Sequence, residues 1–279
     1  MMKSQFQLPE TLSDAPFAGA VDSHIHIVPN DHYGCATASQ ALSLYRRIQA
    51  ETGLTRAVVV QTKSEGTDTS GLVATLKSFG PSARGIAVAL PSISDDDLRR
   101  LDMAGIRGLR FSIWDSHDAV VSIDMIEPLA LRIAPLGWHI QLHAMADQIA
   151  AYAPLLKRLP CQIVFDHFAR LPVNGGLEHP AYEVVCDMLA EKRAWIKLSA
   201  PYLVSPGSSA DLQVESLGSA LVHNSPERVV WGSDWPHMTE ASKPEFQRLK
   251  DMVNPMAQGD TTLLRQIFIS NPNALYGFR

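Results

Sequence analysis

Residues 20–28 read AVDSHIHIV and decide the fold, because they combine an apolar strand with two histidines near its end. Residues two positions apart on a strand point to the same face, so Asp22, His24 and His26 are expected to align. A single histidine in such a strand is ordinarily a hydrogen-bonded core residue. Two on one face, just before the loop at 28–32, favour a functional site.

Seven more short apolar runs follow along the chain. The predicted strands are 20–28, 56–61, 83–90, 105–111, 137–144, 162–168, 194–200 and 228–233. The segments between and after them have helical spacing, at 39–51, 68–79, 122–134, 146–159, 180–192, 210–223, 243–252 and 261–271. A further helix is expected to start at Ser94, a capping residue followed by three aspartates.

This alternation of strand and helix predicts a parallel sheet, and eight units favour closure into a distorted (β/α)8 TIM barrel. The barrel is expected to span 20–279 as a single α/β domain, after an N-terminal extension at 1–19. The length of 279 residues suits one such domain. A doubly wound open sheet is the alternative topology. The most turn-like insertions are 171–179 and 205–209.

Bulk composition limits the partners and the location. The net charge of −5 argues against a nucleic-acid or membrane-surface binder, since either favours a basic face. Three cysteines without CxxC spacing predict reduced thiols and a cytoplasmic protein. No secretory signal and no apolar span of about 20 residues is seen in the sequence. We expect a small-molecule substrate, with oligomerisation left open.

Three further residues that can bind metal or transfer protons lie at the ends of predicted strands. They are His143 in WHIQLHA, His167 in IVFDHFA and Asp234 in VVWGSDWP. In parallel barrels the catalytic groups come from the carboxyl ends of the strands. These residues are therefore expected to converge with His24 and His26.

Such a cluster allows two mechanisms. Imidazoles and a carboxylate can ligate a divalent ion such as zinc and leave a position for water. Without metal, His24 and His26 could polarise a carbonyl while Asp234 takes a proton from water. Spacing alone leaves both open.

Basic residues near strand ends are candidates for substrate binding. Arg110 is expected to point inward and bind a carboxylate, with Arg107 on the opposite face; a surface salt bridge is the alternative for Arg110. Arg170 and Lys63 are weaker candidates, and Lys63 and Lys197 could each be a solvated lysine.

No GxSxG elbow, Walker A motif or GxGxxG after the first strand occurs, which disfavours serine-hydrolase and phosphate-cradling chemistry.

Together these motifs resemble the amidohydrolase superfamily, specifically the amidohydrolase-related (amidohydrolase 2) branch that contains 2-pyrone-4,6-dicarboxylate lactonase and sugar-acid lactonases. The resemblance spans nearly the whole chain. Its landmarks are VDSHIHI at 21–27, VVQ at 59–61, GTD at 66–68, GIRGLRFS at 105–112, FDHFAR at 165–170, VVWGSDWPH at 229–237 and NPNALYGF at 271–278.

The resemblance implies a hydrolase that opens a lactone or related cyclic ester. His24, His26 and His167 would polarise the carbonyl, and Asp234 would activate water. The branch includes metal-free catalysis, although other members of the superfamily use divalent ions. A bound metal would be held by His24, His26, His143 and Asp234.

The chain departs from the pyrone lactonase pattern at three places. His143 replaces a tyrosine and falls where metal-using relatives place a ligand. Lys63 replaces a serine, and the stretch KLSAPYLVS lacks the arginine that follows the seventh strand. A lactone with one carboxylate, bound by Arg110, His143, Lys63 and Arg170, is therefore expected rather than the dicarboxylate itself.

Other functions remain open. The same superfamily includes metal-dependent non-oxidative decarboxylases built on an equivalent His and Asp set, and lactone isomerases. A catalytically silent barrel that only binds a ligand is the third hypothesis, disfavoured by the convergence of so many chemical groups.

Overall fold

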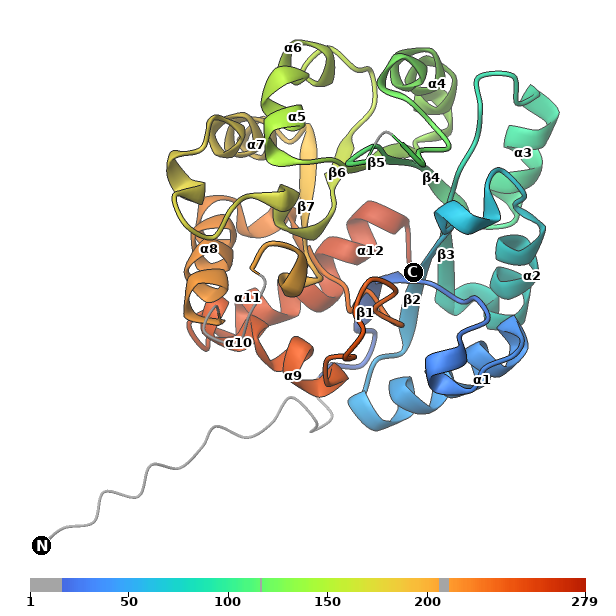
Figure 1. Cartoon of the computed structure of the whole chain (residues 1–279), viewed down its shortest axis with the longest axis horizontal. Coiled ribbons are helices and arrows are strands. Elements are labelled where there is room, and N and C mark those ends of the chain that lie inside the picture. Colours follow the sequence, from blue (N-terminus) through green and yellow to red (C-terminus); the bar gives the residue numbers. More distant parts are fainter. Residues whose placement is uncertain (1–16, 116, 206–210) are drawn as a thin grey trace, which may run out of the picture.

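The computed structural model describes residues 17–115, 117–205 and 211–279. Most of the predicted extension at 1–19, and the turn-like insertion at 205–209 except Ser205, fall outside these residues. The described part folds as one (β/α)8 barrel, with helices surrounding a ring of strands (Figure 1).

The described residues form eight strands, each hydrogen-bonded in parallel to the next in chain order. They are β1 Val21–Ile25, β2 Arg56–Val60, β3 Ala83–Ala87, β4 Ile106–Ser112, β5 His139–His143, β6 Ile163–Phe165, β7 Ala194–Leu198 and β8 Val229–Trp231. All eight predicted strands are confirmed, and the open-sheet alternative is not observed.

The α-helices of the described residues alternate with the strands as predicted. They are α1 Ala38–Thr52, α2 Ser70–Phe79, α3 Asp95–Met103, α4 Ile126–Ile133, α5 Ala146–Ala151, α6 Ala153–Leu156, α7 Pro180–Ala190, α8 Asp211–Asn224, α9 Phe246–Asp251, α10 Val253–Met256, α11 Thr261–Arg265 and α12 Asn271–Tyr276. The expected cap at Ser94 is present, because its side chain accepts from the Asp97 amide. A π-helical segment, Gln266–Ser270, separates α11 from α12.

The barrel closes between β1 and the segment after β8. The Asp234 amide donates to the His24 carbonyl at 2.8 Å, and the His26 amide donates to the Trp235 carbonyl at 2.7 Å. A Cβ atom at Gly232 would lie 2.7 Å from the Cβ of His24, so this close approach requires glycine. The hydrogen bonds that close the barrel therefore also hold the two histidines against Asp234.

The barrel interior is filled by side chains in layers, as expected for a packed barrel. Near its amino-terminal end, Tyr276 and Phe278 pack with valines and an isoleucine of β1, β2 and β3. Leu275 packs there and against a second interior cluster from β6, β7 and β8. In Figure 1, α12 crosses the barrel in projection, in agreement with these contacts. Among the described residues, no helix is both long and apolar enough to cross a membrane.

Candidate active site

Three histidines, in β1 or just beyond the ends of β1 and β6, form a compact cluster. The ring of His24 lies 5.0 Å from that of His26 and 4.9 Å from that of His167. The ring of His143, at the end of β5, lies 4.8 Å from that of His167. The predicted convergence of the four histidines is present in the structure.

Asp234 lies against this cluster with one carboxylate oxygen. Its Oδ1 is 3.4 Å from Nε2 of His24, 3.6 Å from Nε2 of His26 and 3.9 Å from Nε2 of His167. The other oxygen, Oδ2, accepts a 2.7 Å hydrogen bond from the hydroxyl of Tyr202. One carboxylate thus meets three imidazoles that come from two strands.

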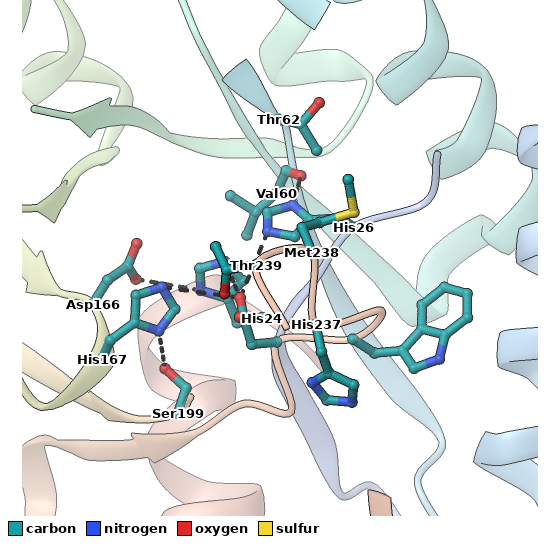
Figure 2. Close-up of polar contacts among 12 residues, drawn as sticks. His24, His26, Val60, Thr62, Asp166, His167, Ser199, His237, Met238 and Thr239 are labelled. Atoms are coloured by element: carbon teal, nitrogen blue, oxygen red, sulfur yellow. Dashed lines mark hydrogen bonds and ion pairs between the residues drawn. The ribbon is translucent and has the colours of Figure 1, made fainter. Parts of the chain in front are cut away.

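The other ring nitrogens of two histidines are held by hydrogen bonds that Figure 2 shows. Nδ1 of His26 lies 2.7 Å from the Val60 carbonyl, and Nδ1 of His167 lies 2.8 Å from Oγ of Ser199. A carbonyl only accepts, so His26 carries its proton on Nδ1, and a neutral His26 presents a lone pair at Nε2.

The backbone that presents these groups is unusual. His167 and the three residues after it all have φ between 52° and 55°, and Asp234 has φ of 61°. Residues other than glycine uncommonly adopt this left-handed region, and residues that do so are enriched at functional sites. The geometry places His167 and Asp234 just beyond their strands, which are shorter than predicted.

Burial and charge set the protonation of the cluster. Burial lowers the pKa of His24, His143 and His167, because it disfavours the protonated imidazole. Burial would raise the pKa of Asp234, but the neighbouring imidazoles of His167, His26 and His24 hold it well below its usual range. An ionised carboxylate is the form that can accept a proton as a general base.

A cavity of about 290 Å³ opens beside the cluster. It is lined by His26, Thr62, Lys63, Ser64, Arg110, Ser112, Trp114, Asp118, His143, His167, Leu203, Asp234, Met238 and Thr239. A larger cavity, of about 790 Å³, lies between α2 and α3 and contains none of these histidines. The chemistry of the lining, rather than size, identifies the smaller cavity as the candidate site.

Arg110 points into this cavity, as its position on β4 predicted, and the surface salt bridge considered for it is not formed. It is 7% exposed and donates to the Gln61 carbonyl at 2.9 Å. Within the described chain, no carboxylate lies within 4.0 Å of its guanidinium, and its Nε has no hydrogen-bond partner. Arg107 on the same strand instead pairs with Asp102. A buried guanidinium without a counterion suits an anionic substrate group.

Lys63 and Arg170 both contact one aromatic ring. Lys63 Nζ is 5.1 Å from the centre of the Trp114 ring, and Cζ of Arg170 is 5.3 Å from it. Lys63 also forms an ion pair with Asp118. Lys63 lines the cavity, whereas Arg170 is outside its lining and contacts it through Trp114. Trp114 was not among the residues predicted from the sequence.

His143 lies farther from the carboxylate than the other histidines. Its Nδ1 is 3.2 Å from the hydroxyl of Ser112, and its Nε2 is buried without a hydrogen-bond partner. Two groups of described residues bring three ligand atoms within 4.8 Å: His24, His26 and Asp234, and His24, Asp166 and His167. His143 belongs to neither group, although it was expected to complete a metal shell.

Beneath the cluster lies a buried polar layer that sequence analysis missed. Lys197, considered as a solvated lysine, is fully buried inside the barrel. Its Nζ contacts Gln141 and Asp166, and both of those residues are at most 1% exposed. A charged residue inside each apolar run, IVFDHFA and WIKLS, was the available signal.

Asp22 does not share the face of the two histidines, contrary to the expected alternation. The pairing of β1 with β2 shifts register between Asp22 and Ile25, which breaks the period of two. Asp22 accepts from the Tyr45 hydroxyl of α1 at 2.9 Å and from the Ser233 amide at 2.8 Å. Asp22 therefore stabilises β1 through contacts on the outer side of the barrel.

Comparisons with known proteins identify the family and relatives with the same fold. A family model described as Amidohydrolase matches residues 21–278. A 2-pyrone-4,6-dicarboxylate hydrolase from Comamonas testosteroni is 31% identical over 98% of this chain and 92% of its own length. A 4-sulfomuconolactone hydrolase from Rhizobium radiobacter is 25% identical over 93% of this chain and 90% of its own. The crystal structure of a probable 2-pyrone-4,6-dicarboxylic acid hydrolase from Acinetobacter baumannii, with citric acid bound, matches with a TM-score of 0.80 at 23% identity, covering 93% of this chain and 100% of that one.

Proposed function

The chain belongs to the amidohydrolase family, as its sequence predicted, and from this premise we propose that it hydrolyses a lactone of a small, carboxylate-bearing substrate. It is an enzyme, since the family match spans nearly its whole length and its relatives include lactone hydrolases.

One observation carries the proposal. The ionised Asp234 faces three imidazoles in a cavity that also holds a buried arginine without a carboxylate partner. A general base, hydrogen-bond groups for a carbonyl oxygen and an anchor for a substrate anion are the parts that ester hydrolysis with carboxylate recognition requires.

The reaction follows from these positions. Oδ1 of Asp234 takes a proton from water, and the resulting hydroxide attacks the lactone carbonyl. N–H groups of His24 and His167 stabilise the oxyanion, after which the ring C–O bond breaks and the leaving oxygen takes up the proton. His26 differs, because its neutral form offers a lone pair at Nε2 and suits holding the water in place.

Arg110 binds the carboxylate of the substrate in this proposal. Lys63, His143 and Trp114 line the same cavity, and Arg170 contacts Trp114 from outside the lining. The relatives' names support the substrate class, since one acts on a pyrone dicarboxylate and another on a sulfomuconolactone. Three free cysteines support the cytoplasmic location that we expect.

The residues also fit a divalent ion. Nε2 of His24 is buried without a hydrogen-bond partner, and it groups with ligand atoms of His26 and Asp234. Two imidazoles and one carboxylate are a suitable zinc set, and His143 lies nearby as a further nitrogen donor. A zinc ion would lower the pKa of a bound water.

A panel of lactones, with and without a carboxylate, tests the proposal. Proton release and product analysis by NMR should show ring opening of the carboxylate-bearing lactones, and Asp234→Asn should abolish it. A product that is still a lactone would indicate isomerisation, and released CO₂ would indicate the decarboxylase alternative. Turnover of an amide or a carboxylic acid with no lactone opened would overturn the proposal.

A further inference from the structure

Lys197 supplies a buried ammonium directly beneath the histidine cluster. Its Nζ lies 2.7 Å from Oε1 of Gln141, 3.2 Å from Oδ1 of Asp166 and 3.4 Å from Nδ1 of His24. An ammonium has three N–H donors and no acceptor. Gln141 and His24 lie at hydrogen-bond geometry to it, whereas Asp166 forms an ion pair. The side chain is 0% exposed, so its ammonium group does not reach the protein surface.

Asp166 is held from two sides in the same layer. Gln141 donates to its Oδ2 at 3.0 Å, while Lys197 lies against Oδ1. Burial would raise the pKa of Asp166, but the Lys197 ammonium and His24 hold it well below its usual range. The group His24, Asp166 and His167 has the composition of a metal site, yet the cation that lies against it is Lys197.

Nδ1 of His24 has two neighbours. One favours a protonated Nδ1, and the other favours an unprotonated Nδ1. Asp166 could only accept a proton from it, whereas the Lys197 ammonium can only donate to it. The contact with Lys197 satisfies hydrogen-bond geometry at 3.4 Å. The contact with Asp166 is also 3.4 Å long, but Oδ1 of Asp166 accepts no hydrogen bond.

We propose that Lys197 is a positioning residue that fixes His24 in the tautomer with its proton on Nε2. In this form His24 directs an N–H toward Oδ1 of Asp234 and the space where a carbonyl oxygen would sit. His26 is held in the opposite tautomer by the Val60 carbonyl. The HxH pair thus contains one donor and one acceptor at Nε2.

The tautomer has a consequence for metal binding. A metal ligates a nitrogen lone pair, so an ion at Nε2 of His24 requires the proton to move to Nδ1, where it would face the ammonium. Lys197 therefore disfavours a metal at His24, whereas Asp166 favours one by accepting the Nδ1 proton. This inference does not depend on the identity of the substrate.

Histidine NMR on the metal-free wild-type protein tests the tautomer directly. Long-range ¹H–¹⁵N spectra distinguish protonated from unprotonated ring nitrogens, and His24→Gln identifies the His24 signals among the 10 histidines. We expect a protonated Nε2 and an unprotonated Nδ1 for His24. A proton on Nδ1 of His24 would overturn the proposal without bearing on lactone hydrolysis.

Zinc affinity of two variants, measured by competition with a chelator, tests the consequence. Lys197→Met should bind zinc more tightly, on the order of tenfold to a hundredfold, and Asp166→Asn should bind it more weakly by a similar factor. Lys250→Met is the matched control, since Lys250 is a buried lysine that donates to the Thr52 carbonyl, at a distance from the cluster. Unchanged or weaker affinity in Lys197→Met would contradict the proposal. If that variant does not fold, the wild-type spectrum decides.

Discussion

The hydroxyl of Tyr202 donates a 2.7 Å hydrogen bond to Oδ2 of Asp234, while Oδ1 of the same carboxylate faces the three histidines. Burial, followed by the charge of Asp234, raises the pKa of Tyr202, so its hydroxyl stays protonated and remains a donor. The two oxygens of Asp234 therefore have separate surroundings: Tyr202 holds Oδ2 in place, and Oδ1 is the atom that would act as the proposed base.

Tyr202→Phe should lower kcat with little change in KM. Removing a hydrogen bond to a charged group costs about 1.5–3 kcal/mol, which corresponds to about a tenfold to hundredfold loss if the bond acts only in positioning the base. Steady-state kinetics on a lactone substrate measure both constants. Tyr182→Phe, in α7 and remote from the cluster, is the control. A raised KM with unchanged kcat would instead show that Tyr202 binds substrate.

Asp234→Asn should reduce kcat by about 10³-fold or more, since it removes the proposed base while keeping the shape of the side chain. The asparagine can still accept from Tyr202, so the fold is expected to be retained. Product binding, measured by calorimetry, should stay within a few-fold of the wild type. Activity close to that of the wild type would show that another group activates the water.

Arg110→Met should weaken catalysis only for substrates that carry a carboxylate. Loss of a charge-assisted contact should reduce kcat/KM for such a lactone by about tenfold to a hundredfold. A matched lactone without the carboxylate should change little. Arg107→Met, on the outer face of β4, serves as the control. Equal losses on both lactones would show that Arg110 acts in structure or chemistry rather than in carboxylate recognition.

The alternation of apolar runs and helical segments in the sequence was sufficient to predict the fold. Eight apolar runs separated by helical segments specify a parallel barrel, because few arrangements bury both faces of such strands. The strand ends were less predictable: His167 and Asp234 lie beyond β6 and β8, in left-handed backbone that tertiary contacts impose. Asp22 was misplaced for the same reason, since a register shift has no signature in side-chain alternation.

The residues predicted for the site form the upper layer of the candidate site. His24, His26, His167 and Asp234 could be found because chemistry at strand ends is informative in a barrel. The layer beneath, with Asp166 and Lys197, could not be distinguished from outward-facing charges. Its burial is tolerable only because Lys197 and Asp166 neutralise each other, and that pairing depends on β6 and β7 being neighbours.

His139→Gln should reduce the loss of folding stability that occurs as the pH falls. His139 is buried at the start of β5, and burial, followed by the charge of Lys197, lowers its pKa from 6.5 to about 3. As the pH falls from about 6.5 to about 3, the unfolded chain binds a proton that the folded protein does not, so the free energy of unfolding falls by up to about 1.4 kcal/mol per pH unit.

Chemical denaturation at pH 7.5 and pH 5 should therefore show the wild type losing about 2 kcal/mol more of its free energy of unfolding than the His139→Gln variant between these two pH values. The comparison cancels other titrating groups and any constant cost of the substitution. Equal losses in the two proteins would mean that His139 is protonated in the folded state.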